Sequence, residues 1–187
     1  RNYGIENATG NYVLPLDSDN KIRPDFLSKA VDVLQNKPQV GVVYGNAKYF
    51  GDKEGVWEIG SFDQDKLLEY NYIDACALIR KEVFKKIGLY DEHLPYQGHE
   101  DWEFWLRVVK ANYNFEFLNM ISFDYRVTKN SMINSFSGQM MNNNLNYIKK
   151  KHYELYFETF KRLRKENNYL RKALNERFIA KIKRKLK

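Results

Sequence analysis

The sequence of 187 residues predicts a layered α/β domain followed by a helical tail. Apolar residues make up 43% of the chain and aromatic residues 16%, which is typical of a folded protein with its own core. Between residues 1 and 127, short apolar segments alternate with segments in which apolar residues repeat every three to four positions. Strand-like segments that alternate with helical ones indicate layers of sheet and helix in one domain.

The first half of this domain is bounded by clear helix signals. Gly10 closes a short helix, because glycine commonly occupies the position just after a helix end. Pro24 opens a second helix, since proline is favoured in a first helical turn. The expected elements are a helix over residues 2–8, a buried strand over 11–16, a helix from 24 toward 38, a strand over 41–50, a turn-rich segment over 51–60 and a short helix over 63–70.

The second half contains an amphipathic helix with a large aromatic face. Trp102, Trp105, Leu106 and Val109 follow a helical spacing, so we assign these side chains to the core. The other expected elements are a strand over residues 73–79, a helix over 81–87 ended by Gly88, strands over 114–118 and 121–127, and a polar loop over 131–144 that leads into a helix.

The positive charge of the chain is concentrated in its tail. We place the domain at residues 1–148 and a basic helical tail at residues 149–187, a segment without Gly or Pro. The tail contains 15 Lys and Arg against 4 Asp and Glu, whereas the domain contains 16 against 20. A mildly acidic domain argues against nucleic-acid binding, which we rank last among the possible functions.

Apolar residues in the tail recur with alternating spacings of four and three. The positions are Tyr156, Phe160, Leu163, Asn167, Leu170 and Leu174, which make a short heptad seam with one polar residue. This pattern fits either a brief pairing with another helix or packing onto the domain. The basic cluster at residues 181–187 suits contact with anionic lipid, or simply a solvated helix end.

The number of cysteines and the hydropathy of the chain indicate in which cellular compartment the protein is expected. The single cysteine, Cys76, excludes an internal disulfide and a zinc site built of cysteines, which favours a reducing compartment such as the cytoplasm. No segment approaches the roughly 18 uninterrupted apolar residues of a spanning helix, and the N-terminus lacks a signal-peptide pattern. We therefore expect a soluble or peripheral protein, with membrane contact only through the tail.

Two carboxylates follow the first expected strand. Asp17 and Asp19 are separated by one residue at what should be the carboxyl end of that strand, where open α/β sheets bind ligands. A pair of carboxylates there suits Mg²⁺ or Mn²⁺ shared with substrate phosphates. The alternative is an acidic turn without a ligand.

A second acidic pair, Glu100 and Asp101, opens the aromatic helix. The helix dipole favours ionised carboxylates in a first turn, and an ionised carboxylate is suited to accept a proton from a hydroxyl as a general base. The alternative is that both residues only stabilise the helix end.

Together these segments resemble a family 2 glycosyltransferase of the GT-A fold over roughly residues 1–135. The matching segments are Arg1-Asn-x-Gly4, Ala8-x-Gly10, Leu16-Asp-x-Asp19, Pro24-x-Phe-Leu27, Asn71-Tyr-Ile73, Arg80-x-x-x-Phe84, Gly88-x-Tyr-Asp-Glu92, Gly98-x-Glu-Asp-Trp102, Trp105-Leu-Arg107 and Tyr125-Arg126. Each segment alone is a weak signal, but they occur in the order expected of the family. The resemblance implies inverting transfer of a sugar from a UDP-linked nucleotide donor to a hydroxyl of a glycan or lipid-linked glycan in cell-surface polysaccharide synthesis.

The resemblance also implies roles for the acidic residues. Asp17 and Asp19 match the Asp-x-Asp motif for metal and nucleotide-sugar, with Asp19 as the direct ligand of Mn²⁺ or Mg²⁺ and Asp17 directed toward the sugar or ribose. Asp101 matches the catalytic base, and Glu100 contacts the acceptor or orients that base. We expect the two acidic pairs to lie on opposite sides of one cleft.

Further substrate contacts are expected around these carboxylates. Arg126 would pair with the diphosphate or form a structural salt bridge, and Trp57 and Tyr96, as loop aromatics, would stack on a sugar ring. His93 and His99 flank the expected acceptor loop without an assigned role.

The sequence departs from the family pattern in three places. The strand, helix and strand that normally bind the base and ribose do not precede Arg1, so we expect a C-terminal portion of a catalytic domain that binds nucleotide-sugar poorly alone. Asn20 replaces a frequent third acidic residue, and Thr128 stands where a histidine often follows. The competing interpretation is a non-catalytic relic or interaction module that uses the basic tail.

Overall fold

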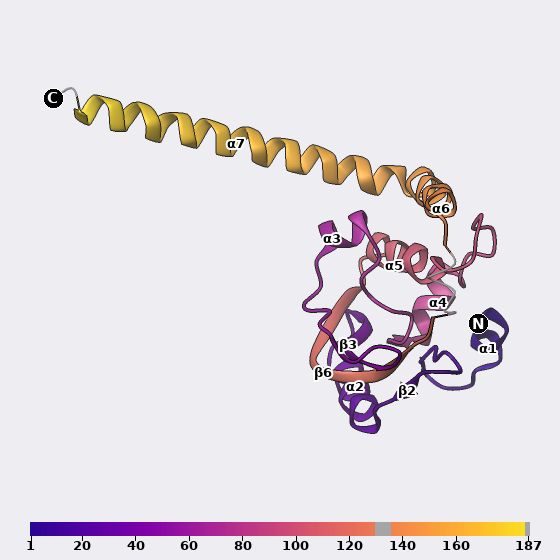
Figure 1. Cartoon of the computed structure of the whole chain (residues 1–187). Helices are drawn as coiled ribbons and strands as arrows, with labels where there is room; N and C mark the ends of the chain where they lie inside the picture. Colours follow the sequence, from indigo (N-terminus) through magenta and orange to yellow (C-terminus); the bar gives the residue numbers. More distant parts are fainter. Residues whose placement is uncertain (130–135, 186–187) are drawn as a thin grey trace. The chain divides into compact units, whose positions relative to one another are not determined.

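A mixed sheet of six strands forms the centre of the first part of the chain (Figure 1). The structure is a computed structural model that describes residues 1–129 and 136–185, with side chains up to residue 177. The chain divides into two units, Arg1–Ile148 and Lys149–Lys187. The sheet and the helices that cover it in the first unit confirm the predicted α/β architecture.

The sheet combines one long parallel pair with antiparallel neighbours. The strands are β1 (Tyr12–Val13), β2 (Lys21–Ile22), β3 (Val40–Gly51), β4 (Gly55–Trp57), β5 (Leu78–Arg80) and β6 (Asn114–Val127). Their order across the sheet is β1, β5, β3, β6, β2, and β4 pairs with β3. β3 and β6 run parallel, whereas the other described pairs are antiparallel.

Residues 114–127 form one strand, so the prediction of two separate strands was wrong. β6 follows β3 along its length, with shifts of register beside Gly45 and Asn46. Gly45 permits the close approach, because a Cβ at this position would lie 2.8 Å from the carbonyl oxygen of Met120. The irregularity therefore interrupts the ladder locally without ending the strand.

Two of the predicted strands are much shorter than expected. The segment 11–16 contains only β1, and the segment 73–79 contributes only its last residues to β5. Oδ1 of Asp74 accepts a hydrogen bond from the backbone N–H of Cys76 at 2.8 Å, which turns the chain before β5 begins. Such side-chain bonds to the backbone compete with the ladder of a sheet. The result is a loop that carries Asp74.

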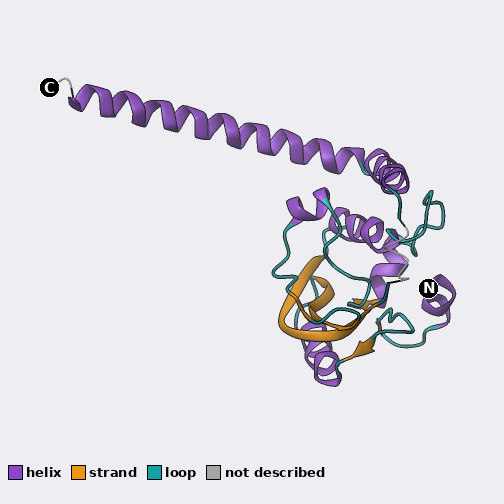
Figure 2. Ribbon diagram, viewed as in Figure 1, coloured by secondary structure: helices purple, strands orange, loops and turns teal. Residues whose placement is uncertain are grey.

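Helices cover both faces of the sheet in the first unit (Figure 2). The helices of the chain are α1 (Asn2–Asn7), α2 (Pro24–Asn36), α3 (Gln64–Glu69), α4 (Lys81–Ile87), α5 (Glu100–Lys110), α6 (Gly138–Lys151) and α7 (Tyr153–Lys185). α2 packs Phe26, Ala30 and Leu34 onto one face of the sheet, with Val40 and Val43 beneath them. α4 and α5 lie on the other side (Figure 1).

The aromatic side chains of α5 are core residues, as predicted. Trp102 and Trp105 are buried, and their indole N–H groups donate to the carbonyl oxygens of Leu67 at 2.6 Å and Ile73 at 2.9 Å. A buried indole N–H needs such a partner. These two bonds join α5 to helix α3 and to the loop that leads to β5.

The second unit is helical. It contains the end of α6 and all of α7. Part of the predicted loop over 131–144 lies outside the described residues, and the chain is helical from Gly138. Within the described ranges, none of the helices has both the length and the apolar character needed to cross a membrane.

Candidate active site

The turn that carries Asp17 and Asp19 lies between β1 and β2. The backbone N–H of Asn20 donates to the carbonyl oxygen of Asp17 at 3.0 Å, which closes the turn. Asn20 is buried, and its side-chain oxygen accepts from the backbone N–H of Arg126 at 2.9 Å. The amide of Asn20 therefore fixes the turn to β6, while the side chain of Asp19 remains exposed.

Arg1 forms an ion pair with Asp17. The guanidinium approaches Oδ1 of Asp17 at 2.6 Å, and both side chains remain about 40% exposed. Burial by itself lowers the pKa of Arg1, but the hydrogen bond and charge of Asp17 raise it above its ordinary value, with smaller contributions from Tyr90 and Asp101. The charges of Asp17 and Asp101 thus act on the same guanidinium, so one carboxylate from each predicted acidic pair belongs to one electrostatic cluster.

Asp101 is buried in the first turn of α5. Oδ2 accepts a hydrogen bond from the amide of Asn71 at 2.9 Å, and Oδ1 accepts from the backbone N–H of Trp102 at 2.8 Å. Burial raises the pKa of Asp101 to about 7, and the charge of Asp74 adds to this rise, whereas the two hydrogen bonds oppose it. A carboxyl group that titrates near neutral pH is suited to general base chemistry.

Asp74 belongs to the same cluster, although no role was predicted for it. Burial raises the pKa of Asp74 to about 6; the hydrogen bond from Cys76 lowers it, and the charge of Asp17 raises it further. Asp74 therefore interacts with the carboxylates of both predicted pairs. The only sequence signal was its position directly after the matched segment Asn71-Tyr-Ile73.

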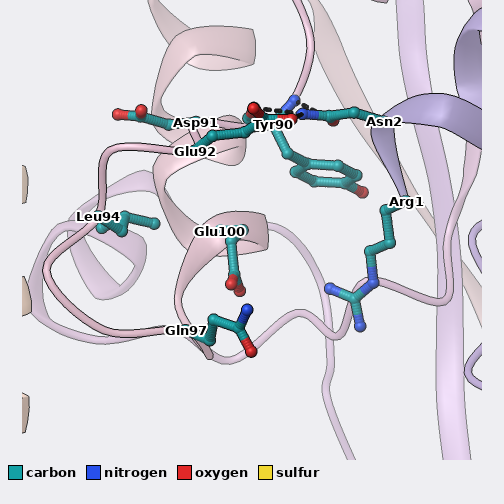
Figure 3. Close-up of a pocket in the computed structure, with 8 residues that line it drawn as sticks. All are labelled: Arg1, Asn2, Tyr90, Asp91, Glu92, Leu94, Gln97 and Glu100. Carbon is teal, nitrogen blue, oxygen red and sulfur yellow. Dashed lines mark hydrogen bonds between the residues drawn. The ribbon is translucent and has the colours of Figure 1, made fainter.

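A hollow of about 540 Å³ opens beside the cluster. Its lining comes from Arg1 and from Asn2 at the start of α1, from the loop between α4 and α5, and from Glu100. In Figure 3 the side chains of Arg1, Gln97 and Glu100 point toward one space, with the ring of Tyr90 beside it. Oε2 of Glu100 also accepts from the backbone N–H of Gly98 at 2.9 Å, which holds this carboxylate at the mouth of the loop.

Asn2 fixes the start of α1 to Tyr90 and Glu92, which also line the hollow. Its amide nitrogen donates to the carbonyl oxygen of Tyr90 at 2.9 Å and to Glu92 at 2.7 Å, and its oxygen accepts from the N–H of Tyr90 at 3.0 Å (Figure 3). These bonds join two segments of the first unit that are 88 to 90 positions apart in the sequence. The position of Arg1 is therefore set by its own helix.

Arg126 lies at the Asp17–Asn20 turn. Its Nε donates to the carbonyl oxygen of Asp19 at 3.2 Å, and its guanidinium lies 4.6 Å from the ring centre of Phe50. The side chain is exposed. A cation is thus held next to the turn on which the carboxylate of Asp19 is exposed.

The two predicted stacking aromatics lie in different surroundings. Trp57 is part of strand β4, where it stacks on Tyr49 at 6.3 Å and meets the edge of Tyr125 at 5.9 Å, so it is a packed residue and not an open loop aromatic. Tyr96 is partly buried in the loop before α5, where its backbone N–H donates to the amide oxygen of Asn144 at 2.9 Å. Tyr96 directly precedes Gln97, which lines the hollow.

The two histidines also differ. His93 is almost fully exposed, and its Nδ1 lies 3.3 Å from a carboxylate oxygen of Asp91. Nδ1 of His99 lies 2.9 Å from the amide nitrogen of Asn144, and burial lowers the pKa of His99. The neutral ring of His99 thus supports the loop that precedes α5.

The chain matches the family described as "Glycosyltransferase like family 2" over residues 1–184. It belongs to this family. It is 27% identical over 97% of its length to an uncharacterized glycosyltransferase of Rickettsia typhi, of which it covers 57%. It is 25% identical over 60% of its length to the amylovoran biosynthesis glycosyltransferase AmsE of Erwinia amylovora, of which it covers 43%. The family resemblance predicted from the motifs is therefore confirmed.

A solved structure has a similar fold. The structure of residues 1–349 of TarS from S. aureus, in complex with UDP-GlcNAc, matches 73% of this chain with a TM-score of 0.56 at 18% identity, and the match covers 40% of that chain. At this identity the similarity concerns the fold alone. The chain described here spans about half the length of the two relatives named above.

The turn can supply part of a metal site for a family 2 glycosyltransferase. Within residues 1–129 and 136–177, no group of three His, Cys, Asp or Glu side chains is placed to hold a metal ion. Mg²⁺-type ions usually take only one or two carboxylates from the protein and the remaining oxygens from substrate phosphates and water. The exposed carboxylate of Asp19 and the half-exposed carboxylate of Asp17 fit that donor set.

Proposed function

We propose that the protein transfers a sugar from a UDP-linked donor to a hydroxyl group of a glycan or lipid-linked glycan, with inversion at the anomeric carbon. The observation that carries this proposal is the buried Asp101, which directly follows Glu100 in the lining of the hollow. Asp101 interacts electrostatically with Asp74 and Arg1, and both of these interact with Asp17 in the Asp17–Asn20 turn. One carboxylate group would thus act on the acceptor, while the turn would hold the leaving diphosphate.

Asp101 would be the catalytic base. At neutral pH a large share of this carboxyl group is ionised, because its pKa lies at about 7. The ionised carboxylate would take the proton from the acceptor hydroxyl as that oxygen bonds to the anomeric carbon and the bond to the diphosphate breaks. Glu100, whose side chain faces the hollow, would hydrogen-bond another acceptor hydroxyl.

The Asp17–Asn20 turn would bind the diphosphate. Asp19 and Asp17 would hold Mn²⁺ or Mg²⁺, which neutralises charge on the departing diphosphate when bound. Arg126, held at the turn by the carbonyl oxygen of Asp19, would add a cation there. Arg1 would orient Asp17 toward the donor through their ion pair.

The comparisons support the choice of donor and acceptor class. TarS was solved with UDP-GlcNAc, and AmsE is named for amylovoran biosynthesis. The lining of the hollow is rich in groups that exchange hydrogen bonds with hydroxyls, such as Gln97 and Glu100. A polyhydroxylated acceptor suits this lining better than an apolar one. The tail, with its basic cluster, would bring the enzyme near a lipid-linked acceptor at the cytoplasmic face of a membrane.

The test is transfer or donor hydrolysis by the protein with UDP-sugars and Mn²⁺. Asp101→Asn keeps the shape of the side chain and removes the base, so we expect the rate to fall by about 100-fold or more, the usual contribution of a general base. Asp25→Asn is the matched control, because Asp25 is an exposed acidic residue in the first turn of α2. Undiminished turnover in Asp101→Asn would refute the assignment of the base, and a retained anomeric configuration in the product would refute inversion.

A further inference from the structure

Helix α7 has an apolar stripe that its own unit does not cover. α7 is one uninterrupted helix over Tyr153–Lys185 (Figure 1). Four large apolar side chains that repeat at spacings of three, seven and four are exposed on it, namely Phe160 at 59%, Leu163 at 44%, Leu170 at 60% and Leu174 at 63%. A single helix cannot bury its own stripe, so these side chains favour a partner that does.

The stripe has the width of a coiled-coil seam. Tyr156, Phe160, Leu163, Asn167, Leu170 and Leu174 alternate in spacings of four and three, which assigns Phe160, Asn167 and Leu174 to position a and the others to position d of a heptad. A helix that lies on a membrane presents a broad apolar face instead. Here the flanking e positions Arg164 and Arg171 are charged and exposed, which narrows the apolar surface to the seam from Phe160 to Leu174, whereas the preceding e position is the exposed Phe157.

Charged residues beside the seam favour pairing of α7 with α7 of a second chain in parallel orientation. In a parallel pair, position g of one helix faces position e of the next heptad on the other helix. Glu166 occupies position g and Arg171 the following position e, so each copy would place Glu166 against Arg171 of the other copy. An antiparallel pair would instead align the e positions with each other, which brings arginines together.

Asn167 supports the same arrangement. It occupies position a in the middle of the seam, and a parallel pair in register brings this residue opposite its own copy, where two amides can exchange a hydrogen bond. Glu166 presently pairs with Arg162 of its own helix at 3.2 Å, with both side chains about half exposed. An exposed pair of this kind contributes under about 1 kcal/mol, so it opposes the new contact only weakly.

We propose that α7 pairs in parallel with α7 of a second copy of this chain along the seam from Tyr156 to Leu174. The pairing buries the exposed side chains of the seam and matches Glu166 with Arg171 across the two helices. It does not depend on the proposed sugar transfer. Because α7 is strongly basic, salt should strengthen the pair by screening the repulsion between the two helices.

The first test is the mass of the chain in solution, measured by light scattering or sedimentation over a concentration series. We expect the mass to rise from that of one chain, 22.4 kDa, toward twice that value, and the rise to begin at lower protein concentration when salt is added. Leu163→Glu places charge in the seam and should restore the mass of one chain. Lys165→Glu is the matched control, since residue 165 lies on the face opposite the seam and the dimer should persist.

The second test is the orientation of the pair. Leu163→Cys should give a disulfide-linked dimer under mild oxidation, because equivalent d positions face each other in a parallel pair, whereas Lys165→Cys should not. The native Cys76 is buried and does not confuse this result. A chain that remains at the mass of one copy at all concentrations, or that links equally well through both variants, overturns the proposal. If the chain instead stays monomeric and binds anionic vesicles, and added salt abolishes this binding, then α7 is a lipid-binding helix and the proposal is wrong.

Discussion

At the scale of single residues, the candidate site depends on how Asp101 is held. Asn71 donates to Oδ2 of Asp101 at 2.9 Å, and its own amide oxygen is buried with no hydrogen-bond partner among the described residues. An unsatisfied buried polar atom costs about 1–3 kcal/mol. A residue that is costly for folding and touches the proposed base is best explained by a role in positioning that base.

The pH dependence of activity tests the state of Asp101. Because burial raises its pKa to about 7, the base is increasingly protonated and inactive as the pH falls below neutrality. We expect kcat/KM for sugar transfer to rise through about pH 7 and to level off above it, as for a single ionising base. A profile that is flat from mildly acidic to alkaline pH would exclude Asp101 as the titrating group.

Asn71→Leu tests the positioning role. The hydrogen bond from Asn71 lowers the pKa of Asp101, so its removal should raise that pKa. The pH at which kcat/KM reaches half its maximum should then increase by about one unit, because a hydrogen bond to a charged group contributes about 1.5 kcal/mol or more and one pKa unit corresponds to about 1.4 kcal/mol. Asn36→Leu is the control, because Asn36 donates a similar bond to Asp32 in α2. If both variants show the unchanged profile, Asn71 has only a structural role.

At the scale of the elements, α5 links the core to the site. Arg107, near the end of the helix, pairs with the fully buried Glu103 at 2.8 Å and donates to the carbonyl oxygens of Ile87 and Leu89. The segment 87–89 leads directly into Tyr90, which lines the hollow. Arg107, in the Trp-Leu-Arg segment matched in the sequence, therefore anchors the start of the loop between α4 and α5.

Arg107→Ala should destabilise the first unit strongly. The change removes the guanidinium that pairs with the buried Glu103 and that anchors the segment 87–89, and the loss of one member of a buried ion pair typically costs about 3–5 kcal/mol in free energy of unfolding. Lys37→Ala provides the comparison, because Lys37 pairs with Glu116 on the surface and its loss should cost under about 1 kcal/mol. Urea unfolding of the two variants measures the difference, and equal costs would contradict the role of α5 as an anchor.

Elements with strong periodicity were predictable from the sequence, whereas the short strands were not. The helices over 24–36, 81–87 and 100–110 were predicted well because proline, glycine and the spacing of apolar residues mark them. The strand over 73–79 was wrong because the carboxylate of Asp74 bonds to the backbone of Cys76 in place of a ladder partner. Asp17 and Asp101 followed from motifs, but the interactions of Asp74 and Asn71 with them are tertiary and leave no local pattern.

At the scale of the whole molecule, the site places carboxylates together at a cost to stability. Asp17, Asp74 and Asp101 come from three separate segments, and each electrostatic interaction among them is repulsive. Arg1 offsets part of this repulsion through its pair with Asp17. Carboxyl groups whose pKa is raised by burial and by a neighbouring charge, as for Asp74 and Asp101, are candidates for functional sites. A stability cost of this kind should therefore appear in the pH dependence of unfolding.

Stability of the first unit should fall as the pH rises from about 4 to 7. Folding raises the pKa of Asp74 to about 6 and of Asp101 to about 7, so over this range the folded chain binds more protons than the unfolded chain. The stabilisation is complete below the ordinary pKa near 4 and is lost as the pH passes the raised values. One unit of pKa shift corresponds to about 1.4 kcal/mol, so the two shifts from 3.8, to about 6 and to about 7, set an upper limit of roughly 7 kcal/mol on the loss in free energy of unfolding.

Two variants separate this effect from the rest of the charge in the chain. Asp74→Asn removes one of the two titrating groups and relieves Asp101, so its free energy of unfolding should vary less between mildly acidic and mildly alkaline buffer than that of the unaltered chain. Asp25→Asn changes the net charge equally at an exposed position and should keep the full pH dependence, because Asp25 lies away from the cluster on α2. Should both variants lose the same share of the dependence, long-range charge and not the acidic cluster would be its origin, since removal of any carboxylate changes the net charge equally.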